Sequence, residues 1–302
     1  MGYTNAIEGR NIEKKFKNFK LDIPELNIPA GFATALIGEN GAGKSTLLNI
    51  LTGIRLDYKG GISFFGEKPT TRRNPESKEK ERIGYTGTEN FFLPQWTVGQ
   101  IEEISELLYS DFDKKRFRSL CSEIAIFPNG GFNGNKKVSD LSDGTKTKLM
   151  LACVLSRNTD ILIMDEPASP LDPLMRDTLC EMIRNYMAEK EGRTVFFSTH
   201  NISDMENVTD YAIVMAAGRI VEAGAVEDLK EKYILVKGEP EGIETASKYM
   251  YSMTKTKYGF EGICLSENLD KLAGLDITTE TPSLYEISVA IMKRSSQVRY
   301  GE

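Results

Sequence analysis

Short apolar runs alternate with stretches of helical periodicity along the first 230 residues. Residues 32–37, 161–164 and 194–198 are mostly apolar, and each run is short enough to be a buried strand. Strands that alternate with helices along a chain are typical of a parallel sheet covered by helices. The pattern therefore predicts an α/β fold.

Helices and turns are predicted between these strands. Residues 45–51 should form a helix that ends at Gly53. Residues 98–127 are expected to be helical because apolar residues recur there at spacings of three and four. Residues 211–215 and 219–222 are two apolar runs joined by Ala-Gly, which predicts a hairpin.

The chain changes character after about residue 232. Short apolar runs at 233–236 and 260–265 alternate with helical segments, and Ser283 with Glu286 forms a capping box that starts a last helix. We expect residues 233–302 to be a small α+β appendage. Since the sheet is predicted to be complete by about residue 230, this segment should pack as a separate layer on the sheet or on a second subunit.

Composition narrows the class of protein. The chain has 302 residues, 40% of them apolar, and a net charge of −6, which fits one large or two smaller globular domains and argues against a protein that coats nucleic acid. The charged stretch 67–82 is predicted to be a solvated loop, and the longest apolar stretch, 149–155, is too short to span a membrane. Neither a zinc site nor a disulfide framework is expected, because no CxxC pair is present and His200 is the only histidine. A reducing cytoplasm fits the four scattered cysteines, Cys121, Cys153, Cys180 and Cys264.

The strongest motif is a glycine-rich loop between a predicted strand and a predicted helix. The run Gly38-Glu39-Asn40-Gly41-Ala42-Gly43-Lys44-Ser45 matches G-x-x-x-x-G-K-[ST] in full. Its glycines let backbone N–H groups face phosphate oxygens, Lys44 can reach the β- and γ-phosphates, and the Ser45 hydroxyl can bind magnesium. The alternative is a chance glycine-rich turn, which the strand before it and the helix after it disfavour.

A second motif lies at the end of the 161–164 strand. Asp165 follows this strand directly, where a carboxylate can hold magnesium through water, and Glu166 comes next, where it can orient and polarise an attacking water. An acidic pair after a strand is usually a surface turn. The glycine-rich loop upstream favours the catalytic interpretation.

Four further segments resemble motifs of the ATP-binding cassette (ABC) ATPases, both in their order along the chain and in their spacing. Leu141-Ser142-Asp143-Gly144-Thr145 is similar to the family signature LSGGQ, and Ser169-Pro170-Leu171-Asp172 is similar to its D-loop. His200 has the position of the switch histidine, and Phe16 that of the aromatic residue that stacks on adenine. Each alone has a structural explanation; the resemblance depends on their co-occurrence over residues 1 to about 230.

The resemblance implies an architecture and a set of site residues. A cassette at 1–232 should contain a RecA-like parallel sheet with a phosphate-loop (P-loop) core, an N-terminal antiparallel β subdomain and a helical insert at about 90–155, followed by the appendage at 233–302. Catalytic roles are expected for Lys44, Glu166 and His200, and magnesium contacts for Ser45, Asp165 and Thr88. Contacts with ATP are expected from Phe16, Gly38, Glu39, Asn40, Gly41, Ala42, Gly43, Lys44, Ser45, Thr46, Ser142, Gly144 and Asp172.

In this family two cassettes pack head to tail. By that resemblance, the Ser142 hydroxyl and the Gly144 N–H would contact the γ-phosphate of ATP held by the partner's phosphate loop. Each chain would then contribute half of each of two sites. A second cassette, as a homodimer or a heterodimer, is therefore an expected partner.

Two departures from the family pattern stand out. Thr88 aligns with the usual glutamine that senses magnesium and the membrane subunit, and the neighbouring Glu89 could replace it. Asp143 and Thr145 stand in the signature where Gly and Gln are usual, and Asp143 brings negative charge near a phosphate site unless it points outward. An active ATPase is still expected.

The expected function is to energise a separate membrane permease from its cytoplasmic face, without binding nucleic acid. The motifs and the tail most resemble bacterial cassettes of exporter type. The apolar cluster at 91–96 is either buried under the helical insert or a docking patch for the permease. The alternatives are a soluble cassette ATPase acting in translation or DNA repair, which would usually carry two cassettes or a long coiled coil, and a P-loop kinase.

Overall fold

The structure is a computed structural model that describes residues 4–67, 81–89, 91–127 and 131–300, with side chains through Ser295. Within these residues the central sheet has six strands in the order β5-β6-β7-β3-β8-β9. Its strands are β3 (Ala33–Ile37), β5 (Ile83–Thr86), β6 (Ile161–Asp165), β7 (Thr194–Thr199), β8 (Tyr211–Ala216) and β9 (Arg219–Ala225). All neighbours are parallel except β8 and β9, which form the predicted hairpin. The expected α/β class is confirmed.

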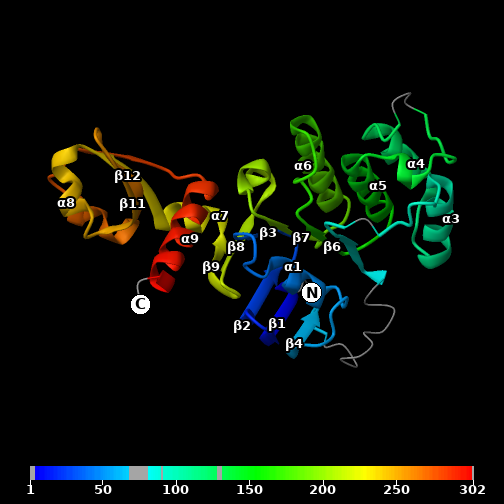
Figure 1. Cartoon of the computed structure of the whole chain (residues 1–302), viewed down its shortest axis with the longest axis horizontal. Coiled ribbons are helices and arrows are strands. Elements are labelled where there is room, and N and C mark those ends of the chain that lie inside the picture. The colour runs from blue at the N-terminus through cyan, green and yellow to red at the C-terminus, as the bar shows by residue number, and fades with distance from the viewer. Residues whose placement is uncertain (1–3, 68–80, 90, 128–130, 301–302) are drawn as a thin grey trace.

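A second, N-terminal sheet lies on one side of the central sheet (Figure 1). It is antiparallel, with the order β2-β1-β4, and consists of β1 (Asn5–Lys15), β2 (Lys20–Pro29) and β4 (Lys59–Phe64). Helix α1 (Lys44–Leu51) buries Leu47 and Leu48 in an apolar core that the two sheets share. This sandwich fixes the loop that joins β3 to α1.

Helices α3 (Val98–Leu108), α4 (Lys114–Glu123), α5 (Asp143–Leu155) and α6 (Pro173–Ala188) lie on the other side of the central sheet (Figure 1). The helical character expected at 98–127 is confirmed for α3 and α4, whereas residues 109–113 between them are not helical. Thr97 starts α3 with a capping box, and the Asp113 side chain accepts the N–H groups of Lys115 and Arg116 to start α4. Of the solvated loop expected at 67–82, residues 68–80 lie outside the described part of the chain.

The tail contains a third sheet with a small core of its own. Strands β10 (Tyr233–Gly238), β11 (Met250–Thr256), β12 (Gly259–Leu265) and β13 (Ile277–Glu280) pair antiparallel in the order β11-β12-β10-β13. Helix α7 (Val226–Lys232) leads into this sheet and α8 (Ile243–Ala246) covers part of it. Short 3₁₀ segments complete the fold at Val138–Asp140, Ile202–Asp204, Glu206–Val208, Pro240–Gly242 and Ser266–Leu272.

The last helix, α9 (Leu284–Tyr300), returns from the tail to the central sheet. Ser283 and Glu286 form the expected capping box, and the Leu284 N–H donates to Glu206 Oε1. The buried face of α9, which includes Ile287 and Ile291, belongs to the same apolar cluster as β8. The central sheet ends with β9 at Ala225, as expected, and the larger core includes residues of α9 that pack on this sheet. The domain division at residue 232 stays a prediction.

Candidate active site

The glycine-rich loop, here called the phosphate loop (residues 38–45), crosses from the end of β3 to the start of α1. Gly43 has a φ of 105°, and a Cβ there would lie 2.7 Å from the Phe19 ring. A Cβ on Gly38 would lie 2.4 Å from the Met215 carbonyl oxygen. Both positions therefore favour glycine, and backbone N–H groups at the start of a helix after such a turn can bind phosphate.

Lys44 lies inside this turn. Its side chain is buried, and its ammonium donates to the carbonyl oxygens of Gly38 at 2.7 Å and Glu39 at 3.3 Å. The same ammonium lies 3.3 Å from Glu166 Oε1. The positive charge is therefore held at the mouth of the loop, where phosphate oxygens would compete with the carboxylate for it.

Ser198, on the neighbouring strand β7, holds the Asp165 carboxylate and the Glu166 backbone at the end of β6. Ser198 Oγ donates to Asp165 Oδ1 at 2.5 Å and accepts the Glu166 N–H at 3.0 Å. The β6–β7 register pairs Asp165 with Ser198. Glu166 has a φ of 50°, which is the left-handed region and costs a non-glycine residue free energy.

His200 completes the network of polar contacts around Glu166. Its Nδ1 lies 2.7 Å from Glu166 Oε2, and its backbone N–H donates to the same oxygen at 3.3 Å. Asp165, Glu166 and His200 line a cavity of about 320 Å³ together with Asn40 and Thr88. The structure thus brings together Lys44, both carboxylates and the histidine, as the sequence predicted.

Of the remaining predicted residues in and next to the loop, Ala42 is buried and most of the others are exposed. Glu39, Asn40 and Ser45 are exposed, and Thr46 is half-buried in the first turn of α1. Thr88 and Glu89 are both exposed beyond β5, and Thr88 lines the cavity. Next to them, burial first and then the charges of Asp165 and Glu89 raise the pKa of Tyr85 to about 12, so this phenol stays neutral.

Phe16 lies in the turn between β1 and β2, with 40% of its surface exposed. The Lys14 ammonium and the Arg55 guanidinium each lie 5.3 Å from the centre of its ring. These cations hold the ring by cation–π attraction. An exposed aromatic face in this position can stack against a flat base.

The signature loop (residues 141–145) starts helix α5. Ser142 is its N-cap: Ser142 Oγ accepts the Thr145 N–H at 3.2 Å and lies 2.8 Å from Thr145 Oγ1. The Asp143 side chain is 91% exposed and pairs with Lys146 at 2.9 Å. The unusual acidic residue therefore points outward, and a neighbouring cation offsets its charge.

The signature loop also contacts the D-loop of the same chain. A Cβ on Gly144 would lie 3.1 Å from the Pro170 carbonyl oxygen, so glycine allows this close approach. Asp172, predicted to contact nucleotide, accepts the Met175 N–H and caps α6. Among the described residues, Ser142 and Gly144 do not line the cavity that contains Glu166.

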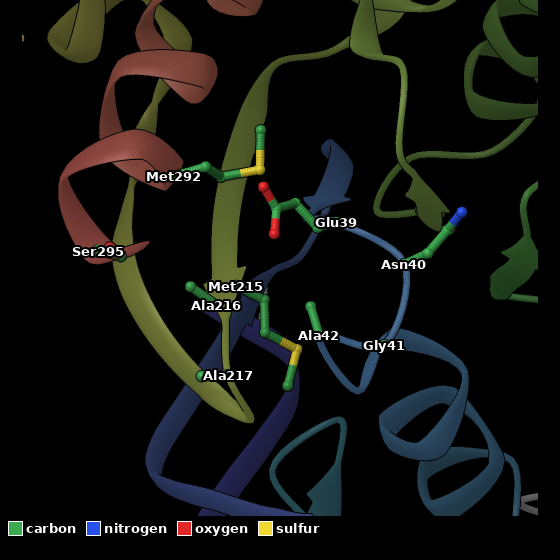
Figure 2. A pocket seen from close by; sticks show the side chains of 9 residues that line it. All are labelled: Glu39, Asn40, Gly41, Ala42, Met215, Ala216, Ala217, Met292 and Ser295. Carbon is green, nitrogen blue, oxygen red and sulfur yellow. The ribbon is translucent and has the colours of Figure 1, made fainter. Parts of the chain in front are cut away.

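A smaller pocket of about 90 Å³ also borders the phosphate loop (Figure 2). Glu39 and Ala42 form one wall, and Met215 of β8 forms part of the floor. Met292 and Ser295 of α9 close the other side, with Met292 extending towards Glu39. A helix from the tail is therefore a direct neighbour of the phosphate loop.

The apolar cluster at 91–96 combines both interpretations that the sequence allows. Phe92 is buried in the larger core and Trp96 packs against it, whereas Phe91 and Leu93 are about half exposed. The buried residues anchor the segment. The exposed pair is the part that is available for a partner.

The donor set near Asp165 fits a magnesium ion bound with nucleotide. Among the residues that the structure describes, no group of three His, Cys, Asp or Glu side chains could hold a metal ion. Magnesium in nucleotide sites takes only one or two protein ligands, and phosphates and water complete its shell. Buried Asp165 and the exposed Ser45 hydroxyl at the start of α1 provide hard oxygen donors of this kind.

Ser198 is the residue of the site that sequence reasoning missed. The sequence predicts only a strand at this position, although Ser198 holds the Asp165 carboxylate and the Glu166 backbone. Its place at the carboxyl end of a parallel strand, two residues before His200, was the available signal.

A glycine-rich loop with its lysine, next to an acidic pair at the end of a parallel strand, defines a P-loop nucleotide-binding fold. Comparison with known proteins narrows this class. Residues 21–169 match the family model described as ABC transporter.

Curated relatives agree with this match. The chain is 31% identical over 233 residues to the Nod factor export ATP-binding protein I of Burkholderia orbicola, covering 76% of this chain and 73% of the relative. It is 29% identical over 245 residues to the nickel import ATP-binding protein NikO of Rhodobacter capsulatus, covering 78% of this chain and 94% of the relative.

Solved structures share the fold. The cbiO1 protein of Clostridium perfringens, part of the ABC transporter complex cbiONQ, aligns with a TM-score of 0.60 at 26% identity, covering 75% of this chain and 90% of that chain. An ATP-binding subunit of an ABC transporter aligns with a TM-score of 0.63 at 22% identity, covering 74% and 92%.

The chain belongs to the family of ATP-binding subunits of ABC transporters, which are ATPases that power transport. These relatives do not favour a role in translation or DNA repair. No helix within the described residues is both long enough and apolar enough to cross a membrane.

Proposed function

We propose that this chain hydrolyses ATP at a site that a second cassette completes. The observation that carries the proposal is the separation of the two phosphate-binding elements. Lys44 and Glu166 form one charged site, whereas Ser142 and Gly144, at the start of α5, are not among the described residues that line the cavity beside it. A helix start that carries a serine hydroxyl suits the γ-phosphate of a nucleotide held by another chain.

In this proposal the phosphate loop and Lys44 bind the β- and γ-phosphates. The incoming phosphates would take over Lys44 from Glu166, because both compete for one ammonium. Glu166, released from that ion pair and still bonded to His200, would orient the attacking water and accept its proton. His200 would hold the Glu166 carboxylate and approach the γ-phosphate.

Magnesium would be held by Ser45 and Asp165, with Thr88 facing the same cavity, and would supply charge neutralisation between the β- and γ-phosphates. Ser198 would fix the Asp165 oxygen that it contacts. The adenine base would stack on the exposed face of Phe16. Residues 39–43 of the phosphate loop and Thr46 would surround the phosphates. Asp172 would lie at the interface between the two cassettes.

The proposed partner beyond the second cassette is a membrane permease. The exposed residues Phe91 and Leu93, close to Thr88 in sequence, offer an apolar contact surface. The chain would then lie at the cytoplasmic face of the membrane, attached through the permease. Since the relatives include both an import and an export subunit, the exporter type stays a prediction.

Glu166→Gln tests the proposal. The amide cannot accept the proton of water, so we expect ATP binding to persist, turnover to fall at least 100-fold, and an ATP-bound dimer to accumulate on size-exclusion chromatography with magnesium. Lys44→Ala should instead weaken ATP binding itself. Glu191→Gln, at an exposed site on the loop before β7, is the matched control and should keep normal turnover. Near-normal turnover of Glu166→Gln would contradict the assignment.

A further inference from the structure

Thr145 contacts the signature serine twice. Its N–H donates to Ser142 Oγ at 3.2 Å, and its hydroxyl oxygen lies 2.8 Å from the same atom. The first contact is the ordinary helix cap. The second exists because this chain has a hydroxyl residue at position 145.

Hydrogen counting limits what the second contact can be. A serine hydroxyl has one hydrogen and two lone pairs. The Thr145 N–H uses one lone pair of Ser142. If Ser142 donated its hydrogen to Thr145, that hydrogen would be lost to an intrachain bond. If Thr145 donates instead, both lone pairs of Ser142 are filled and its hydrogen points away from the helix.

A phosphate oxygen only accepts hydrogen bonds, so it selects the second arrangement. The surrounding groups support it. The Thr147 hydroxyl already donates to the Asp143 carbonyl oxygen at 3.1 Å, and Lys146 holds the Asp143 carboxylate. Thr145 is therefore the side chain of this turn that is placed to set the Ser142 hydroxyl.

We propose that Thr145 is a positioning residue: its hydroxyl donates to Ser142 Oγ and turns the Ser142 hydrogen outward, towards a phosphate oxygen of ATP bound by the partner cassette. This inference rests on the proposed function, because it requires Ser142 to meet that phosphate. The donated bond also polarises the serine hydroxyl, which strengthens it as a donor.

Thr145→Val removes the hydroxyl but keeps the shape and the N–H cap. We expect the kcat of ATP hydrolysis to fall about tenfold, which is less than the roughly 100-fold expected when Ser142→Ala removes a transition-state donor. The KM for ATP should change less than twofold, because ATP binds first to the phosphate loop of the other chain. Thr145→Ser keeps the hydroxyl and should stay within about threefold of the native kcat.

Two comparisons separate positioning from folding. Thr178→Val removes a helical hydroxyl that donates to the Leu174 carbonyl oxygen on α6, and it should leave kcat unchanged. If Thr145→Val does not fold, Thr145→Ser and Thr145→Ala form a second pair that differs only in the hydroxyl. The double variant Ser142→Ala with Thr145→Val should be no slower than Ser142→Ala alone, because Thr145 acts through Ser142.

The outcomes distinguish the two hypotheses. A slowed Ser142→Ala with a normal Thr145→Val would overturn the role of Thr145 and leave the proposed function standing. Equal loss in Thr145→Ser and Thr145→Val would also overturn it, because the hydroxyl would not be the cause. Normal turnover in Ser142→Ala would overturn the shared site itself.

Discussion

Glu166 is held in a backbone conformation that a glutamate rarely adopts. Its φ of 50° directs the side chain between Lys44 and His200, and such strain costs about 1–3 kcal/mol. The Ser198 hydroxyl offsets part of this cost by accepting the Glu166 N–H. One serine therefore supports both the backbone of Glu166 and the carboxylate of Asp165.

Ser198→Ala should remove the support of both the Asp165 carboxylate and the Glu166 backbone. The buried Asp165 oxygen loses its donor and the Glu166 N–H its acceptor, so we expect a loss of about 1–3 kcal/mol in unfolding free energy. We also expect kcat to fall about tenfold or more. Steady-state ATPase assays and urea unfolding measure both effects.

Ser156→Ala is the matched control. Ser156 is buried and donates to the Ala152 carbonyl oxygen within its own helix end, away from the site. It should affect stability but not kcat. If both variants lowered kcat equally, the effect of Ser198 would be one of general stability.

At the scale of elements, Asp160 joins three segments at the start of β6. Its carboxylate accepts from Arg82, just before β5, at 2.6 Å, and from Lys190, after α6, at 2.5 Å. Burial is the largest single influence and raises the pKa of Asp160, but the hydrogen bonds and charges of Lys190 and Arg82 outweigh it and lower the pKa below its usual value. The ionised form therefore stabilises the fold.

Asp160→Asn should destabilise the protein most at neutral pH. Because the pKa of Asp160 is lower in the folded state, its contribution is complete above the unfolded pKa of about 4. That contribution disappears as the pH falls through the folded pKa. The difference in unfolding free energy between native protein and variant should therefore shrink as the pH falls below about 4.

Urea unfolding at a series of pH values measures this difference. Asp270→Asn, an exposed site in the tail, should show no such trend. A difference in unfolding free energy between native protein and Asp160→Asn that stayed constant below pH 4 would contradict this prediction. That result would mean that the charge of Asp160 does not stabilise the fold.

The elements show what a single sequence can and cannot predict. Apolar runs predicted β3, β6 and β7 because strands buried on both faces carry little else. The break between α3 and α4 was missed because apolar spacing continues across it, although Asp113, the N-cap of α4, marks it.

The site also contains residues that the sequence could predict and residues that it could not. Lys44, Asp165, Glu166 and His200 were predictable because the carboxyl ends of parallel strands converge at one edge. Ser198 was not, since a serine in a strand has no distinctive pattern. The bond between Ser142 and Thr145 depends on side-chain rotamers, which spacing does not determine.

At the scale of the whole molecule, α9 connects the tail to the cassette. Ile287 is fully buried in the larger core, and Met292 further along α9 lines the pocket beside the phosphate loop. A substitution within α9 should therefore change the stability of the cassette.

Ile287→Ala should lower the unfolding free energy by about 2–5 kcal/mol, because it leaves a cavity against the central sheet. Trp96, the only tryptophan, packs against the same core, so its fluorescence follows cassette unfolding. We expect its transition to move to lower urea. Val236→Ala, in the separate small core of the tail sheet, should move this transition less. An unchanged Trp96 transition in Ile287→Ala would show that α9 is only loosely attached.

The position of α9 in the core has a consequence for synthesis on the ribosome. Val226 and Leu284 belong to one apolar cluster but are 58 residues apart in the chain. At about 5–20 residues per second, roughly 3–12 s separate their translation. During that interval the phosphate loop and both carboxylates have already been made, while the face of β8 that α9 will cover is bare. A nascent chain at this stage exposes apolar surface and is prone to aggregate. The uncovered face of β8 is where a chaperone that recognises apolar strands would bind.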